Sequence, residues 1–307
     1  RRGLGTFLAR IIRTWNELPA IVLPLGYNIG SFKRRLFCMK RQSCLQCSLS
    51  PSADIKLYRT RGRQRGVLVM FSYQHYDQNI EPPRLGADVD VTNLRYLFTE
   101  LGFKVIVYSD LKMAQTRATL GKLQDVFSGS QQPDTVFIMF SSHGYMRAGT
   151  SDNEIRCSCG GLISLHEYFN NEKFPALKGV PKVFVFQNCR GDKDEYTLRA
   201  PPHLPEPQRD GGGRGGATAD GARPTADAED VAVLVSPGSV SRRDPVAGSW
   251  YIQVLCQVFA ERAHDRHVAD LFTLVDQRLQ ERYSTQTSSV DRWGFNKRLY
   301  LHPGLYE

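Results

Sequence analysis

The sequence predicts an α/β fold in which a mainly parallel central sheet is flanked by helices, giving three layers. Two observations lead to this class. Short runs made almost only of apolar residues recur along the chain, and amphipathic segments lie between them. Strands that are apolar on both faces are typical of parallel sheets buried between helices, and their alternation with helices indicates βαβ connections.

The first ordered zone supplies four of the expected strands. Each is a short run dominated by Val, Ile, Phe, Leu or Met, such as TVFIMF and KVFVF. The expected strands cover 66–71, 104–108, 135–140 and 182–186, and the expected helices cover 88–101 and 114–127. Apolar residues in the first of these helices stand three and four positions apart, which is the spacing of one buried helix face.

A break in the pattern at 201–230 predicts a flexible linker. This stretch holds five prolines and six glycines, and its one large apolar residue is Leu204. Such a composition buries too little apolar surface to offset the entropy lost on ordering. After the break we expect a strand at 231–235, helices at 249–262 and 267–283 and a strand at 298–301. One sheet assembled from both zones is the simplest arrangement of these elements.

Charge and cysteine usage narrow the class of protein. The net charge of +9 comes from residues 1–65, which hold 14 Lys or Arg against two acidic residues, so the remainder is mildly acidic. We therefore expect a solvated basic arm and no specific nucleic-acid binding, with a nucleic-acid-binding protein led by this arm as an alternative. Seven cysteines, an odd number, and the lack of a long apolar run favour a soluble, cytoplasmic protein outside any membrane.

Two cysteine pairs, at 44–47 and 157–159, raise the question of a metal site. Structural zinc sites commonly use two CxxC pairs, whereas the second pair here is CxC and lies about 110 residues from the first. The spacing therefore argues against a metal, and we expect no cofactor.

His143 and Cys189 each follow a buried strand directly, in the segments FSSHG and FQNCRG. Loops that leave the carboxyl ends of neighbouring parallel strands share one edge of the sheet, so the two side chains are expected to lie close together. A thiolate beside an imidazole is a nucleophile for acyl transfer, and the imidazole can then protonate a leaving amine. Taken singly, a buried cysteine and a packed histidine fit the pattern equally well.

The segment Gln187–Gly191 resembles the active-site signature of caspases, Q-A-C-[RQG]-G, whose histidine lies about 50 residues upstream. In this chain the separation is 46 residues. The motifs RLGADVDVTNL at 84–94, SHG at 142–144 and GSWYIQVLC at 248–256 extend the similarity over about 66–300. On these motifs the chain is identified as a member of the caspase family, of an invertebrate type. The resemblance implies the three-layer caspase fold and a cysteine endopeptidase that cuts after aspartate in apoptosis or innate immune signalling.

The resemblance also implies roles for individual residues. Arg84, Gln187 and Arg243 would form the S1 pocket for the substrate aspartate, where two guanidinium groups can hold one carboxylate through charge-assisted bonds. A basic P1 residue would meet two like charges there. The other implied roles are the amides of Gly144 and Cys189 for the oxyanion, the carbonyl of Pro82 for orienting His143, Ser241 and Arg243 for pairing with the substrate backbone, Arg242 for the S2 side and Trp250 for the S4 side.

By the same resemblance the chain divides into a large catalytic subunit at 66–200, an inter-subunit linker at 201–230 and a small subunit at 231–307. The linker would be cleaved after Asp220 or Asp227, which makes the chain a zymogen. The active form implied is a homodimer of cleaved units that acts on protein substrates with aspartate at P1.

Three departures from the caspase pattern keep an alternative open. Asn188 stands where caspases have alanine, and Arg242 stands where they have an apolar S2 residue. Residues 1–60 resemble the C-terminal tail of a retrotransposon reverse transcriptase, which a fused exon or an erroneous gene model would explain. The alternative is a catalytically inactive caspase homologue that acts as a regulator or decoy.

Overall fold

The computed structural model describes residues 54–60, 62, 65–129, 132–146, 153–164, 166–169, 171–172, 174–188, 208–209, 232–237, 241–284 and 286–301. The reverse-transcriptase-like segment, most of the predicted linker, Cys189, Asp220 and Asp227 lie outside these residues. Within the described residues, no helix combines the length and the apolar character needed to span a membrane.

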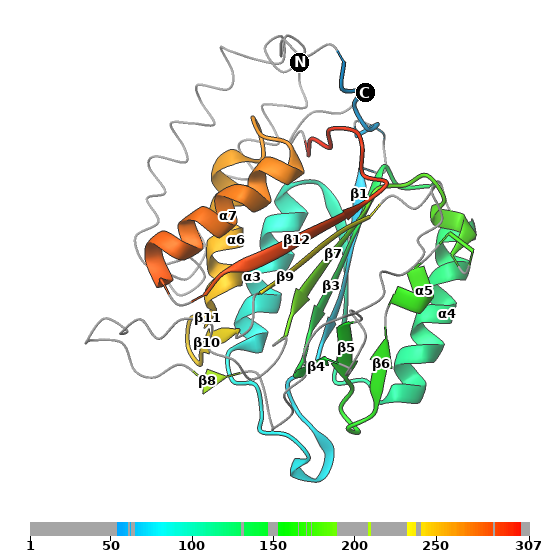
Figure 1. Ribbon diagram of the computed structural model, residues 1–307. Coiled ribbons are helices and arrows are strands. Elements are labelled where there is room, and N and C mark those ends of the chain that lie inside the picture. Colours follow the sequence, from blue (N-terminus) through cyan, green and yellow to red (C-terminus); the bar gives the residue numbers. More distant parts are fainter. Residues whose placement is uncertain are drawn as a thin grey trace.

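A six-stranded sheet forms the centre of the molecule (Figure 1). In spatial order its strands are β12 (Ser288–Trp293), β9 (Ala232–Pro237), β7 (Lys182–Gln187), β3 (Thr135–Ser141), β1 (Gly66–Ser72) and β2 (Phe103–Ser109). Neighbouring strands are parallel except for β12 and β9, which are antiparallel. The predicted fold class is therefore confirmed. Two of these strands follow the predicted linker in the sequence and extend the same sheet.

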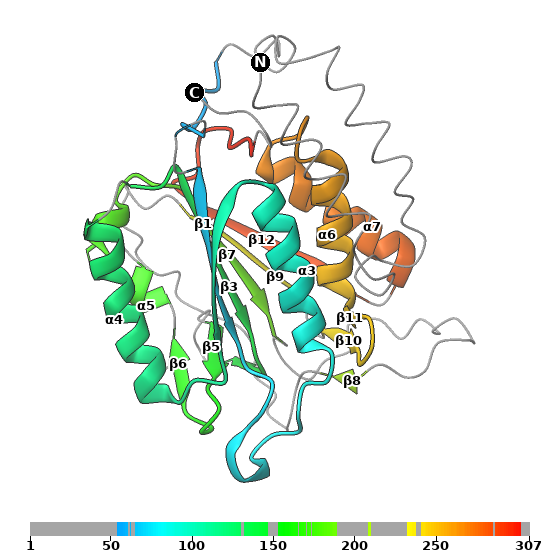
Figure 2. The ribbon, with the colours of Figure 1, turned by 180° about the vertical axis from the view of Figure 1, so that it is seen from behind.

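Helices cover both faces of the sheet, as Figures 1 and 2 show. One face carries α3 (Ala87–Glu100), α6 (Trp250–Arg262) and α7 (Val268–Tyr283), and the other carries α4 (Met113–Gly129) and the short α5 (His166–Phe169). The three predicted layers are thus present, and helices from both sides of the predicted linker share one face.

Strands β1, β3 and β7 each bury side chains in two separate apolar cores. In β1, Leu68 and Met70 join the core that contains α3, α6 and α7, whereas Val67, Val69 and Phe71 join the core that contains α4. The alternation follows from strand geometry, because successive side chains point to opposite faces. This double burial explains why the sequence shows continuous apolar runs instead of a polar–apolar alternation.

Two small antiparallel sheets lie outside the central sheet. One contains β4 (Gly144–Met146), β5 (Asn153–Arg156) and β6 (Leu162–Ser164), and the other contains β8 (Gln208–Arg209), β10 (Arg242–Asp244) and β11 (Gly248–Ser249). The 3-10 helices η2 (Asp77–Asn79) and η3 (Pro175–Leu177) complete the elements of the described residues. Both small sheets lie toward the carboxyl ends of the central strands (Figure 1).

The C-terminal part of the sheet differs from the prediction. A strand is expected at 298–301, but Arg298 and Tyr300 form only isolated bridges, to Leu57 and His267. The edge strand is instead β12, whose sequence SSVDRW is mostly polar and has no buried residue. Apolar patterning does not reveal such a strand, because an edge strand needs little apolar surface.

Candidate active site

The carboxyl ends of β3 and β7 lie side by side. Ser141 and Gln187 are paired in the parallel register, and the Ser142 amide donates a hydrogen bond to the Gln187 carbonyl at 3.3 Å. His143 therefore stands two residues beyond one member of a strand pair, and Cys189 follows two residues after the other in the sequence. Cys189 lies outside the described residues, so its distance from His143 stays a prediction.

The His143 ring is buried and held from two sides. Its Nε2 lies 3.0 Å from the carbonyl oxygen of Pro82, the residue predicted to orient it. The amide of His143 donates to the Tyr76 hydroxyl at 3.1 Å, and the two rings contact each other with centroids 5.2 Å apart. Since a carbonyl only accepts, Nε2 carries the proton, and in the neutral ring the lone pair is on Nδ1. Nδ1 is therefore the nitrogen that could take a proton from a thiol.

Gly144 packs directly against Asn188. A Cβ placed on Gly144 would lie 2.4 Å from Nδ2 of Asn188 and 2.6 Å from its Cβ, so a larger residue would collide. The Asn188 side chain is only 1% exposed, and among the described residues its Oδ1 has no hydrogen-bond partner. The departure from alanine at this position thus buries an unsatisfied polar atom beside the predicted nucleophile, where a cost of about 1–3 kcal/mol is expected.

Arg84 is fully buried and bonded to the ends of three strands. Its Nη1 donates to the Tyr73 carbonyl at 2.8 Å and to the Ser141 hydroxyl at 3.0 Å, and its Nη2 donates to the Gln187 carbonyl at 3.4 Å. A buried charge is tolerated only where it is paired or hydrogen-bonded. These contacts fix the guanidinium at the carboxyl ends of β1, β3 and β7.

Arg243, on β10, is equally buried and lies beside the same segment. Its Nε donates to the carbonyl of Leu85 at 2.8 Å, and Leu85 is the neighbour of Arg84 in the chain. The Gln187 amide group donates to the Ser241 hydroxyl. The structure therefore brings together Arg84, Gln187, Ser241 and Arg243, which the sequence separates into three distant segments.

Arg242 and Trp250 are stacked in a small aromatic cluster. The Trp250 ring lies against Tyr283, with centroids 4.1 Å apart and planes 8° apart, and the Arg242 guanidinium lies 5.9 Å from the Trp250 centroid. The Arg242 amide donates to Oε1 of Gln286 at 3.1 Å. Trp250 is buried, so packing occupies much of its surface, and the predicted S2 and S4 roles of these two residues stay predictions.

Sequence reasoning does not identify two residues that contact Arg84 and His143, namely Ser141 and Tyr76. Ser141 contacts Arg84 and could have been suspected, because it is the polar residue that ends an apolar strand. Tyr76 contacts His143 across 67 positions, and no motif marks it. Such contacts depend on how η2 and its flanking segments fold over the sheet edge.

The cysteines at 157 and 159 have ordinary hydrogen-bonding partners. Cys157 is buried, with Sγ 3.7 Å from the Thr116 hydroxyl and 3.9 Å from the Tyr73 hydroxyl. Cys159 accepts a hydrogen bond from the Met113 amide at 3.3 Å, and such amide bonds lower the pKa of its thiol. No group of three His, Cys, Asp or Glu side chains suited to a metal occurs in the part of the chain that the structure describes.

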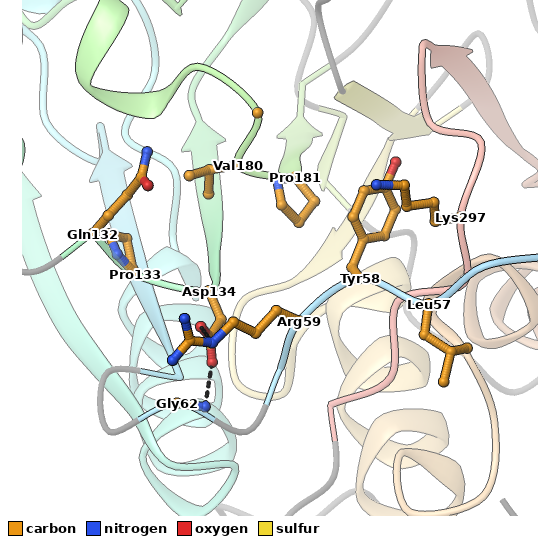
Figure 3. Close-up of a pocket in the computed structure, with 11 residues that line it drawn as sticks. Leu57, Tyr58, Arg59, Gly62, Gln132, Pro133, Asp134, Val180, Pro181 and Lys297 are labelled. Atoms are coloured by element: carbon orange, nitrogen blue, oxygen red, sulfur yellow. Dashed lines mark hydrogen bonds and ion pairs between the residues drawn. The ribbon is translucent and has the colours of Figure 1, made fainter. Parts of the chain in front are cut away.

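A pocket of about 560 Å³ lies near the amino ends of the central strands, at the end of the sheet opposite His143 (Figure 3). Its lining includes Arg59, Lys297 and Asp134, and Asp134 directly precedes β3 whereas His143 follows it. The Asp134 carboxylate accepts from the Gly62 amide at 2.6 Å and lies 3.6 Å from Nε of Arg59. These bonds tie the segment before β1 to the start of β3, and the pocket is separate from the cluster around His143.

Comparison with known proteins gives one family. A family model described as "Caspase domain" matches residues 65–300. Caspase Dronc of Drosophila melanogaster is 31% identical over 277 residues, which covers 83% of this chain and 60% of that protein. Caspase-6 of Gallus gallus is 26% identical over 264 residues, covering 80% of this chain and 83% of that protein. The chain thus spans less than two thirds of the Drosophila relative.

Solved structures agree with this result. The crystal structure of the Drosophila initiator caspase Dronc matches with a TM-score of 0.59 and 25% identity, over 83% of this chain and 91% of that chain. The crystal structure of caspase-1 from Spodoptera frugiperda matches with a TM-score of 0.62 and 21% identity, over 81% of this chain and 94% of that chain, and supports the fold.

Proposed function

The chain belongs to the caspase family, and we propose that it is a cysteine endopeptidase that cleaves protein substrates after aspartate in apoptosis or innate immune signalling. The observation that carries the proposal is the cluster of Arg84, Gln187 and Arg243, buried at the sheet edge that also holds His143. Fully buried arginines are uncommon in proteins, because burial removes the guanidinium from water at a cost in free energy.

The charges of this cluster favour an acidic P1 residue. A P1 carboxylate would be held by charge-assisted hydrogen bonds from two guanidinium groups and by the Gln187 amide. A P1 lysine or arginine would instead bring a third positive charge into a partly desolvated pocket, which costs several kcal/mol. The proposed specificity follows from this difference.

In the proposed reaction His143 and Cys189 act as a pair. Nδ1 of His143 accepts the thiol proton, and the Cys189 sulfur adds to the scissile carbonyl carbon. The amides of Gly144 and Cys189 donate to the resulting oxyanion. Collapse breaks the C–N bond as the imidazolium gives its proton to the leaving amine. Water, deprotonated by His143, then hydrolyses the thioester and returns the free thiol. The Pro82 carbonyl stabilises the imidazolium through Nε2.

The proposed maturation divides the chain into 66–200 and 231–307 by cleavage in the linker 201–230, after Asp220 or Asp227. Caspases typically dimerise, and we extend this to cleaved units of the chain, acting in the cytoplasm. Parallel pairing of β7 with β9 joins the two parts within one sheet. The cleaved parts would therefore remain associated through backbone hydrogen bonds and the shared core.

A positional peptide library tests the P1 specificity. The purified full-length protein should cleave P1 aspartate with a kcat/KM at least about 100-fold above P1 lysine, since each 1.4 kcal/mol is tenfold. Cys189→Ala is the control and should abolish turnover. A profile led by lysine or arginine contradicts the proposed specificity, and full turnover by Cys189→Ala contradicts the proposed nucleophile.

The buried, unsatisfied Oδ1 of Asn188 favours one alternative, an inactive homologue that regulates active caspases. The two functions differ in their response to an aspartyl fluoromethyl-ketone probe. An enzyme forms a thioether at Cys189 with loss of fluoride, which mass spectrometry detects on the peptide containing that residue. An unlabelled chain, tested beside an active caspase, supports the regulator.

A further inference from the structure

A buried carboxylate lies close to the two pocket arginines. Asp90, in the first turn of α3, has 1% of its surface exposed. Its Oδ1 accepts a hydrogen bond from the Ser249 amide at 2.8 Å, and its Oδ2 accepts one from the Ser249 hydroxyl at 2.5 Å. Both oxygens thus hold one residue that is 159 positions away in the sequence.

Ser249 is the residue paired with Arg243. The β10–β11 hairpin is antiparallel, and its register sets Arg243 opposite Ser249. Asp90 therefore anchors the strand beside Arg243, while the Leu85 carbonyl anchors the Arg243 side chain. Leu85 and Asp90 belong to one short segment that begins with Arg84. The segment that leads into α3 thus contains Arg84 and also fixes the position of Arg243.

Two glycines permit this close contact. A Cβ on Gly248 would lie 2.4 Å from Oδ1 of Asp90, and a Cβ on Gly86 would lie 2.5 Å from the carbonyl oxygen of Asp244. Their φ angles are +87° and +84°, in the region that favours glycine. Packing this tight leaves the hairpin little room to move independently, so a change at Asp90 is transmitted to β10.

Asp90 also acts on the arginines through its charge. Burial raises the pKa of Asp90 to about 6, and the hydrogen bonds of Ser249 and the positive charges of Arg243 and Arg84 oppose that rise. Cys256 on α6 also faces this site, and its thiol pKa is raised by burial and by the Asp90 charge. At pH 7.5 the Asp90 carboxylate is therefore ionised and the Cys256 thiol is neutral.

We propose that Asp90 is a positioning residue that fixes the Arg243 guanidinium for the P1 carboxylate by holding Ser249 across the β10–β11 hairpin. The proposal rests on the proposed function and adds a specificity-determining residue that does not touch the substrate itself. Its effect on substrate is indirect, through the position of Arg243.

The test replaces Asp90 by asparagine in the full-length chain, with Asp88→Asn as the matched control, because Asp88 lies in the same helical turn but is exposed. At pH 7.5, Asp90→Asn should raise KM for a P1-aspartate peptide about tenfold or more, the size expected for a hydrogen bond to a charged group, with a smaller change in kcat. Asp88→Asn should leave both constants unchanged.

The pH profile separates positioning from general damage to the fold. The ratio of KM between Asp90→Asn and wild type should fall toward 1 as the pH is lowered from 7.5 to 5, because the wild-type carboxylate then also becomes neutral. A ratio near 1 at pH 7.5, a lower KM in the variant, or a loss confined to kcat overturns the proposal. A lower KM would mean that Asp90 acts only by repelling the P1 carboxylate.

Amide hydrogen exchange gives a readout that needs no turnover. The peptide covering 243–249 should exchange faster in Asp90→Asn than in wild type and in Asp88→Asn, because the Ser249 amide loses its charged acceptor. Unchanged exchange overturns the positioning role. A wild-type protein without aspartate-directed turnover overturns the proposed function instead, and the exchange result then still decides the role of Asp90.

Discussion

Asp90→Asn should change how the stability of the chain depends on pH. In wild type, burial raises the Asp90 pKa from 3.8 to about 6, so the folded protein binds a proton at this site more tightly than the unfolded chain does. The associated stabilisation is fully present below the unfolded pKa and is lost as the pH rises through about 6. Asparagine does not titrate, so the variant lacks this loss.

The magnitude follows from the size of the shift. A shift of about 2 pKa units corresponds to about 3 kcal/mol, since one unit is about 1.4 kcal/mol. Between pH 4 and pH 7.5 the stability of Asp90→Asn relative to wild type should therefore rise by about 2.4 kcal/mol, because the unfolded carboxyl is already partly ionised at pH 4. The altered hydrogen bonds to Ser249 add an offset that does not depend on pH, so the slope is the informative quantity.

Urea unfolding measures this slope. Both proteins would carry Cys189→Ala, which prevents self-cleavage in the proposed mechanism, and would be unfolded at several pH values between 4 and 7.5. Taking the difference between variant and wild type cancels the other titrating groups. A difference that stays constant across this range would refute the reasoning, because Asp90 would then titrate alike in the folded and unfolded chains.

Two further predictions concern the surroundings of His143. Asn188→Ala removes the buried Oδ1 that has no partner among the described residues, so it should raise the free energy of unfolding by about 1–3 kcal/mol without loss of activity, as urea titration and peptide turnover would show. Tyr76→Phe removes the hydroxyl that accepts from the His143 amide, so it should lower the stability by about 1–3 kcal/mol and reduce kcat; an unchanged melting temperature and kcat would contradict that role.

Buried strands are the most predictable part of this fold. The runs expected at 66–71, 135–140 and 182–186 each differ from the observed strand by one residue at the carboxyl end. Burial on both faces requires a continuous run of apolar residues, which can be recognised from the sequence without knowing the tertiary structure. The edge strand β12 carries no such signal, because one of its edges and much of its side-chain surface meet solvent.

The candidate site residues also fall into two groups, those that sequence motifs mark and those that only tertiary contacts reveal. The spacing of motifs marks Arg84, Gln187 and Arg243 as candidates, and the structure brings them together, while their role in the site stays a prediction. Tyr76 and Asp90 could not be predicted, since their relevance comes from contacts across 67 and 159 positions. Asp90 even lies within a recognised motif, but nothing in the local sequence reveals that its carboxylate is buried against a hairpin from the far end of the chain.

The bonds around Arg243 bear on what linker cleavage would change. In the uncut chain, Leu85 already accepts from Arg243, and Gln187 already donates to Ser241. The core that includes α3 and β1 also contains apolar residues of α6 and α7, so both sides of the linker share it. Cleavage is therefore not needed to bring Arg84 and Arg243 together. The linker residues Gln208 and Arg209 pair with Arg243 and Arg242 of β10, so a gain in activity on cleavage would come from release of that pairing or from a change nearer Cys189.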